Sequence, residues 1–221
     1  MTKTTSLSRA AALAVAILAI GSTGCEDPAA QKPRATVGSA KPTTSATPDR
    51  KATGQAIKLE IDAAQSKVEW VGSKVTGKHD GGFKTISGSV ESKDGKIEGG
   101  KVSVTIDMTS VYSDADKLTE HLKADDFFAV DKHPKSTFES TEVKKGGSDG
   151  ASHTVTGNLM LRGVTKSITF PATLALDDKA LTVKAEFVIN RKDFGIAYEG
   201  KKDDLIRDDV VIKLDLTVPR G

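Results

Sequence analysis

Apolar and polar residues alternate along most of the chain after residue 56, as expected for β-strands with one buried face. The alternation is clearest at 96–111, where Val102, Val104, Ile106 and Met108 are separated by polar residues. The same period predicts eight strands, around 68–71 and at 82–91, 96–111, 137–145, 153–162, 167–176, 181–190 and 209–218. Glycine-rich or aspartate-rich turns at 93–96, 146–150 and 177–179 are typical of hairpins, so neighbouring strands should be antiparallel. Periodicity alone leaves a two-sheet sandwich and a closed barrel as alternatives.

One segment, 117–140, does not have the strand pattern. Leu118, Leu122 and the pair Phe127 and Phe128 fall at spacings that place them on one side of a helix and its continuing turn. Ser113, with an acidic residue three positions later, resembles a weak capping box at the start of this helix. We expect one short helix against a body built from strands, with the helix acting as a lid or plug.

The N-terminus has the pattern of a bacterial secretory signal. Two basic residues precede an apolar run at 10–20 and a small-residue stretch that ends at Cys25, so residues 1–25 are interpreted as a signal peptide. The sequence Ser22-Thr-Gly-Cys25 resembles a lipobox, in which the cysteine is acylated, although Ser22 replaces the commonest leucine. We therefore predict lipidation of Cys25 and a membrane-anchored periplasmic location, with ordinary cleavage as the alternative. Cys25 is the single cysteine of the chain, so no internal disulfide can form.

The next segment, 26–55, is rich in Pro, Ala, Thr, Ser and Lys. Such a composition buries too little apolar surface to offset the entropy of ordering. We expect a disordered tether between the anchor and a folded domain at 56–221.

Composition also narrows the function. A net charge of +2, without a basic stripe, argues against a nucleic-acid-binding protein. The chain has no Gly-x-Ser-x-Gly elbow, phosphate-binding glycine loop, His-Glu-x-x-His or cysteine cluster, and its four histidines are scattered. We predict neither catalytic residues nor a metal site, and no cofactor.

Four segments together resemble the YceI-like family of bacterial periplasmic lipid-binding proteins. They are Lys78-His79-Asp80 with Gly82-Phe83 and Gly88; Leu118, His121-Leu122, Asp126-Phe127-Phe128, Pro134 and Phe138; the run 155–166, VTGNLMLRGVTK; and the run 189–196, INRKDFGI. They occur in the family's order across almost the whole predicted domain. The resemblance implies an antiparallel, eight-stranded, lipocalin-like barrel with one short helix, enclosing an apolar cavity that holds an isoprenoid chain, an isoprenoid quinone or a related amphiphile.

The resemblance and residue size together suggest which side chains contact such a ligand. The candidates for the apolar cavity are Trp70, Phe83, Leu118, Leu122, Phe127, Phe128, Phe138 and Phe194. For each aromatic residue an ordinary core position is at least an equal alternative, and of the adjacent Phe127 and Phe128 only one should face inward. His79 is a candidate polar contact at the cavity mouth, and Arg191 and Asp193 are expected to form ion pairs or hydrogen bonds that fix a turn.

Three functional readings remain at this point. The first is a lipid carrier of the envelope, the second an enzyme acting on an amphiphile in the same cavity, and the third an interaction protein whose barrel is filled by side chains. The sequence does not indicate the oligomeric state or the ligand.

Overall fold

The computed structural model describes residues 27–42, 57–93 and 96–220. Its longer strands are β3 (Lys67–Lys74), β4 (Gly77–Phe83), β5 (Ile86–Lys93), β6 (Lys96–Asp107), β8 (Lys135–Lys145), β9 (His153–Leu161), β10 (Val164–Leu176), β11 (Ala180–Asn190) and β14 (Asp209–Pro219). Short strands are β1 (Thr36–Ser39), β2 (Ile57–Glu60), β7 (Val111–Ser113), β12 (Gly200–Lys201) and β13 (Asp204–Leu205). The helical elements are α1 (Asp116–Lys123) and the 3-10 turns η1 (Met108–Ser110) and η2 (Arg191–Phe194). The described part of the chain is therefore mainly β with one α-helix, as predicted.

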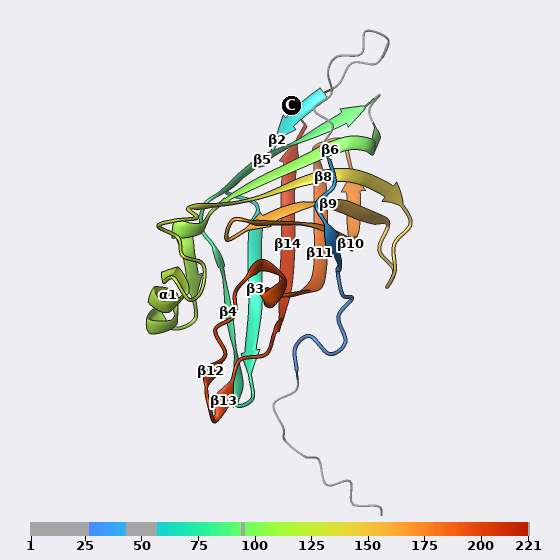
Figure 1. Cartoon of the computed structure of the whole chain (residues 1–221). Helices are drawn as coiled ribbons and strands as arrows, with labels where there is room; N and C mark the ends of the chain where they lie inside the picture. The colour runs from blue at the N-terminus through green and yellow to red at the C-terminus, as the bar shows by residue number, and fades with distance from the viewer. Residues whose placement is uncertain (1–26, 43–56, 94–95, 221) are drawn as a thin grey trace, which may run out of the picture.

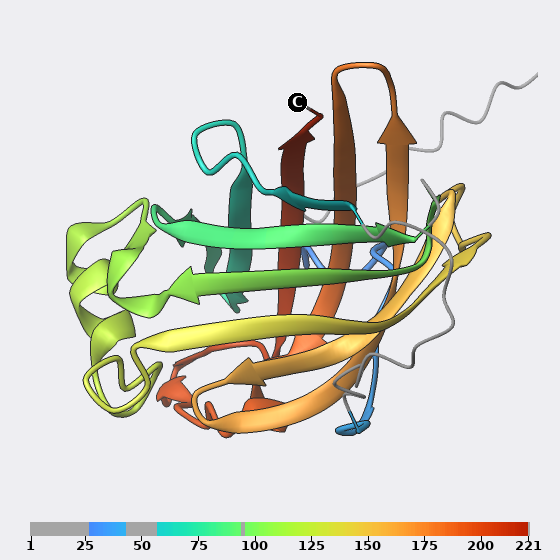
Figure 2. The same ribbon diagram turned by 90° about the horizontal axis from the view of Figure 1, so that it is seen from above.

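The strands form an antiparallel sheet that curls into a barrel (Figure 1). Pairing proceeds from β3 to β4, from β5 to β6, and on through β8, β9, β10, β11 and β14 back to β3. Two corners complete the ring, because β4 continues into β5 and β6 continues through η1 into β7, which pairs with β4. In Figure 2 the strands β5, β6 and β8 run across β11 and β14 on the opposite wall. Eight strands result when each bent pair counts as one strand; the described residues also contain four short strands that the alternation did not predict.

The predicted helical segment 117–140 is shorter than expected. Helix α1 ends at Lys123, a series of turns follows, and the residues from Lys135 onward belong to strand β8. The capping-box prediction is wrong: Ala115 is the N-cap and has no side-chain cap bond, while Ser113 lies in β7 and its Oγ accepts a hydrogen bond from the Ala115 N–H. The serine lies two residues before the N-cap position of a helix that begins at Asp116.

The prediction that 26–55 is a disordered tether is wrong for residues 27–42, which we call the strap. Within it, β1 pairs with the 166–169 portion of β10. On its other side, the Ala35 N–H donates to the Val188 carbonyl, and the Val188 N–H donates to the Pro33 carbonyl, both at 2.9 Å. Strands β10 and β11 pair with each other only at one end, between Thr173 and Leu176, so the strap fills the opening between them. The remaining part of the predicted tether, 43–56, lies outside the described residues.

Side-chain contacts also hold the strap on the outer surface of the barrel. Ala29 is buried in a small apolar cluster with Val71, Val188 and Val211. Lys32 forms an ion pair with Glu186 at 2.9 Å, and Arg34 forms one with Asp209. Asn158 exchanges two hydrogen bonds with the backbone of Lys41. Composition did not indicate this docking because main-chain pairing with an open sheet edge requires little of the side chains.

Candidate functional site

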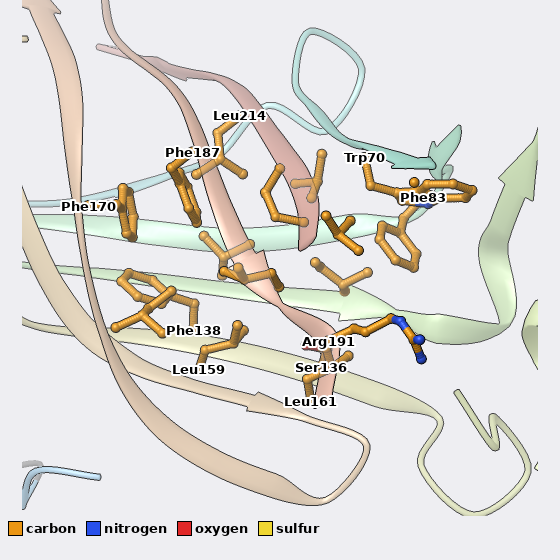
Figure 3. A pocket seen from close by; sticks show the side chains of 18 of the residues that line it. Trp70, Phe83, Ser136, Phe138, Leu159, Leu161, Phe170, Phe187, Arg191 and Leu214 are labelled. Atoms are coloured by element: carbon orange, nitrogen blue, oxygen red, sulfur yellow. The ribbon is translucent and has the colours of Figure 1, made fainter. Parts of the chain in front are cut away.

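An apolar pocket of about 310 Å³ occupies the interior of the barrel (Figure 3). The inward faces of the barrel strands supply its wall, because alternate residues of each strand point to the same side of a sheet. Val210, Ile212, Leu214 and Leu216 of β14 are an example of such a face. The pocket shows that side chains do not fill the barrel completely, which argues against the reading of a filled interior.

Aromatic side chains gather at two places along the pocket. In one group the rings of Phe170 and Phe187 stack with centroids 4.1 Å apart, and Phe138 lies 5.7 Å from Phe170. In the other, Phe83 and Phe128 lie 6.1 Å apart, close to the segment that follows α1. Figure 3 shows the first group and Phe83 at separate ends of the drawn lining.

Trp70 lies beside Phe83 in Figure 3, and Gly81 makes room for its indole, whereas a Cβ at Gly72 would make only an ordinary contact. A Cβ at Gly81 would lie 2.2 Å from Trp70 Cζ2, and one at Gly72 would lie 3.6 Å from Cζ3. Since Gly81 pairs with Trp70 across β3 and β4, a larger residue there would push the ring from its place in the wall. Glycine at position 81 therefore allows the Trp70 indole to approach the backbone of β4 closely.

Most of the residues selected from sequence lie together in this pocket. The lining includes Trp70, Phe83, Leu118, Leu122, Phe127, Phe128, Phe138 and His79. Phe194 is different: it is fully buried in η2 and is not part of the lining. Cys25 lies outside the described residues. The geometry thus gathers seven of the eight apolar candidates into one cavity wall, and assigns Phe194 to the core.

Phe127 and Phe128 both line the pocket, so the expectation that only one faces inward is wrong. That expectation rested only on the two residues being adjacent, whereas they lie in a turn, where neighbouring side chains can share a side. The ring of Phe127 also packs against His121, with ring centroids 4.9 Å apart, and against Tyr198, with centroids 5.3 Å apart. The segment after α1 is therefore part of the wall at this end of the pocket.

Three positively charged or ionisable side chains reach the lining, and each has an acidic partner. Lys74 pairs with Asp204, His79 Nδ1 lies 2.8 Å from Asp114 Oδ1, and Arg191 Nη2 donates to Asp208 Oδ1 at 3.0 Å. Ser73 and Ser136 also line the pocket, and Ser73 Oγ is buried without a hydrogen-bond partner among the described residues, but apolar groups supply nearly all of the remaining lining.

Arg191 has a structural role, as predicted, although its ion-pair partner is Asp208. Its guanidinium also donates to the backbone carbonyls of Ile196, Ile206 and Arg207 at 2.7–3.4 Å. Because the side chain is nearly fully buried, these bonds compensate for the loss of water and fix the loop that carries β12 and β13. Asp193 is the acidic residue in the first turn of η2.

The carboxyl group of Asp114 is perturbed by its surroundings. Partial burial raises its pKa, but hydrogen bonds from His79 and from the Asp80 N–H lower it more, so the pKa lies below the ordinary value for aspartate. Asp114 is therefore ionised at neutral pH and holds the imidazole in place at the pocket rim.

Sequence reasoning missed several lining residues, including Phe170, Phe187, Leu159 and Arg191. Leu159 and Phe187 fall in the strands predicted at 153–162 and 181–190, but alternation cannot distinguish a packed core from a cavity wall. For Arg191 no sequence signal separated a pocket residue from a turn residue. In the parts of the chain that the structure covers, no group of three or more His, Cys, Asp and Glu residues is arranged to hold a metal ion. In the same residues, no helix has the length and apolar character needed to cross a membrane.

Comparison with known proteins identifies the family. The sequence model of the YceI-like domain matches residues 59–218. A UPF0312 protein of Pseudomonas aeruginosa is 40% identical over 122 residues, and one of Pectobacterium atrosepticum is 38% identical over 122 residues. Each match covers 52% of this chain and 62% of the relative, so the chain spans somewhat under two thirds of these relatives' length.

Solved structures share the fold. BcnA of Burkholderia cenocepacia is 28% identical, with a TM-score of 0.62, over 71% of this chain and 98% of that protein. A polyisoprenoid binding domain from Saccharophagus degradans, implicated in plant cell wall breakdown, gives a TM-score of 0.60 over 76% of this chain and 100% of that domain. At 18% identity the second likeness concerns the fold alone. With a domain match across most of the folded region and the same barrel architecture, the chain belongs to the YceI-like family.

Proposed function

We propose that the protein binds an isoprenoid-type amphiphile, such as a polyprenyl chain or an isoprenoid quinone, in the barrel pocket, and sequesters or carries it. The observation that carries the proposal is the continuous apolar lining of the pocket, with the charged side chains paired at its rim. The polyisoprenoid-binding role of the domain from Saccharophagus degradans supports the same ligand class.

The physical driving force is the removal of apolar surface from water. Burial of hydrocarbon contributes about 25 cal/mol per Å² and needs no polar partner along the chain. A pocket of about 310 Å³ lies at the lower end of the usual range for small-molecule sites, which suits a slender chain better than a broad ring system. A polar head group would remain near the rim, where His79 and Asp114 lie.

Binding explains the pocket better than catalysis does. A catalytic acid or base needs a free polar group that faces the reacting atoms. Here Lys74 and Arg191 are each engaged with a carboxylate, and Arg191 is bound to three carbonyls as well. His79 Nδ1 lies against Asp114, and the lining is otherwise almost entirely apolar, which favours binding of a hydrocarbon chain.

We also propose a place for the protein in the cell. The signal-like sequence 1–25 and its lipobox-like end support export and acylation of Cys25, which would anchor the protein to a bacterial envelope membrane. An acylated N-terminus with several chains is a stable anchor.

Two measurements test the function. The full chain, purified from a bacterial host, is extracted with organic solvent and the extract identified by mass spectrometry. Trp70 is the single tryptophan of the chain and lines the pocket, so its fluorescence also reports on added ubiquinone, which quenches indole emission on contact. We expect an isoprenoid lipid in the extract and saturable quenching of Trp70.

A matched pair of variants locates the binding. Val183→Phe fills the pocket from β11, whereas Thr182→Phe adds the same side chain at the adjacent position, outside the lining. Overpacking costs about 1–3 kcal/mol, so folding of both variants is checked by circular dichroism. The first should lose retained lipid and quenching, and the second should keep both. Recovery of no apolar compound together with unsaturable quenching would overturn the proposal.

A further inference from the structure

The strap fixes the point at which the N-terminal sequence reaches the barrel. Asp27 Oδ2 accepts a hydrogen bond from Arg207 Nη1 at 3.3 Å, and Ala29 is buried two residues later. Arg207 in turn donates its N–H to the Ser73 carbonyl, near the end of β3. The described chain therefore begins beside β12 and β13, at the lower end of the barrel in Figure 1.

Two exposed apolar side chains lie at this same end. Val75, in the turn between β3 and β4, is 57% exposed, and Leu205, at the end of β13, is 48% exposed. The Val75 N–H donates to the Leu205 carbonyl at 3.2 Å, so the two turns are joined. We call this surface the tip and define it as 75–76 and 201–205. Only four large apolar residues are prominently exposed in the described residues. Two of them, Val75 and Leu205, are in contact, which distinguishes the tip from the rest of the described surface.

The charge on the tip is weakly positive, with the exposed Glu199 just before it. Lys201 and Lys202 are exposed on the β12–β13 hairpin, while the carboxylate of Asp204 is already neutralised by Lys74. Asp203 is exposed beside them and offsets one of the two free lysines. Lysines near a membrane surface are attracted by anionic lipids, and exposed aliphatic side chains enter the interface.

The tip also adjoins the pocket. Lys74 and Ile206 form a β-bridge directly behind Val75 and Leu205, and both line the pocket. The pocket wall therefore lies directly behind the tip, and passage of an apolar molecule here requires the bonds between the β3–β4 turn and the β12–β13 hairpin to open.

The length of chain outside the structure connects these observations to a membrane. Cys25 precedes Asp27 by two residues, and two residues span at most roughly 7 Å. An acyl anchor on Cys25 would therefore hold this end of the barrel against the bilayer, since the strap leaves no long tether. We propose that the tip docks on the lipid bilayer and is the port through which the amphiphile passes between membrane and pocket. This inference rests on the proposed lipid-binding function.

The test separates delivery from binding. The full chain is mixed by stopped flow with vesicles of phosphatidylethanolamine and phosphatidylglycerol that contain ubiquinone, and the rate of Trp70 quenching is measured. The same ubiquinone is then supplied from detergent micelles. Val75→Asp with Leu205→Asp tests the tip. Leu176→Asp is the control, because Leu176 is also 48% exposed but lies at the end of β10, where it pairs with Leu181 near the start of β11 and away from the tip.

The tip variant should slow quenching from vesicles about tenfold, which corresponds to about 1.4 kcal/mol, and should leave the extent of quenching from micelles unchanged. The Leu176→Asp variant should behave as the unaltered protein. Equal rates from vesicles in the tip variant and the unaltered protein, or equal slowing in the Leu176 control, would overturn the assignment of the tip. Failure of quenching from both sources in the unaltered protein would instead overturn the binding function on which it rests.

Discussion

Truncation of Phe187 tests whether the barrel interior is hollow. One face of its ring stacks on Phe170, at 4.1 Å between centroids and an interplanar angle of 14°, and Figure 3 shows the ring between Phe170 and the middle of the pocket. Phe→Ala in a fully packed core costs about 3–5 kcal/mol. If the second face of Phe187 has no packing partner, roughly half of the dispersion contacts are absent already, and we expect a loss of about 2 kcal/mol.

Phe194→Ala is the control for this experiment. Phe194 is 0% exposed and does not line the pocket, so its truncation should cost the full 3–5 kcal/mol, as a rough figure. Both values come from urea unfolding of lipid-free protein, with unchanged m-values as the check on two-state behaviour. Bound ubiquinone would contact the free face of Phe187 and should raise the cost of its truncation. Equal losses at the two positions, with and without lipid, would refute the argument that the pocket is open.

Three further predictions follow from individual contacts. Gly81→Ala should shift the emission of Trp70 and destabilise the fold by about 1–3 kcal/mol, because the new Cβ would lie 2.2 Å from the indole; an unshifted spectrum contradicts this. Ala29→Asp should speed proteolysis of the strap about tenfold, since burial of an unpaired polar group costs about 1–3 kcal/mol; unchanged cleavage would show that the strap does not depend on this cluster. The pKa of Asp204 is lowered, chiefly by the hydrogen bond from Lys74. The ionised carboxylate therefore stabilises the folded protein fully above the unfolded pKa of about 3.9. This stabilisation is lost as the pH falls through the lower pKa of the folded state. Asp204→Asn should therefore flatten the acid limb of the urea-midpoint profile, and an identical profile would argue against the ion pair.

The strand pattern anticipated the individual strands because it depends on local order, and the family resemblance anticipated the barrel. Strict alternation in strands such as β6 and β11 requires only that one face be buried. Turn residues between them favour antiparallel hairpins, which need no long-range information. The same local rules failed at α1, where the turn after Lys123 places Phe127 and Phe128 on a common side.

The sequence predicted which kinds of residue form the candidate site, but not which of them line the pocket. Large apolar residues in the matched motifs, such as Trp70 and Phe83, proved to line one pocket, but Phe194 from the same kind of motif is buried in the core. Whether such a residue lines the pocket or is buried in the core depends on the position of its element in the fold, here η2, and the periodicity of the sequence does not indicate that position. Phe170 and Phe187 were missed because a cavity wall and a packed core require the same alternation.

The sequence by itself determined the antiparallel hairpins and the apolar inner face, since these follow from residue periodicity and turn chemistry, and its motifs indicated the family. Tertiary structure alone decided that the interior is open and that the strap, 27–42, completes the wall between β10 and β11. It also decided that Val75 and Leu205 meet at one tip. These features depend on contacts between segments as far apart as Asp27 and Arg207, and such contacts leave no local pattern in the chain.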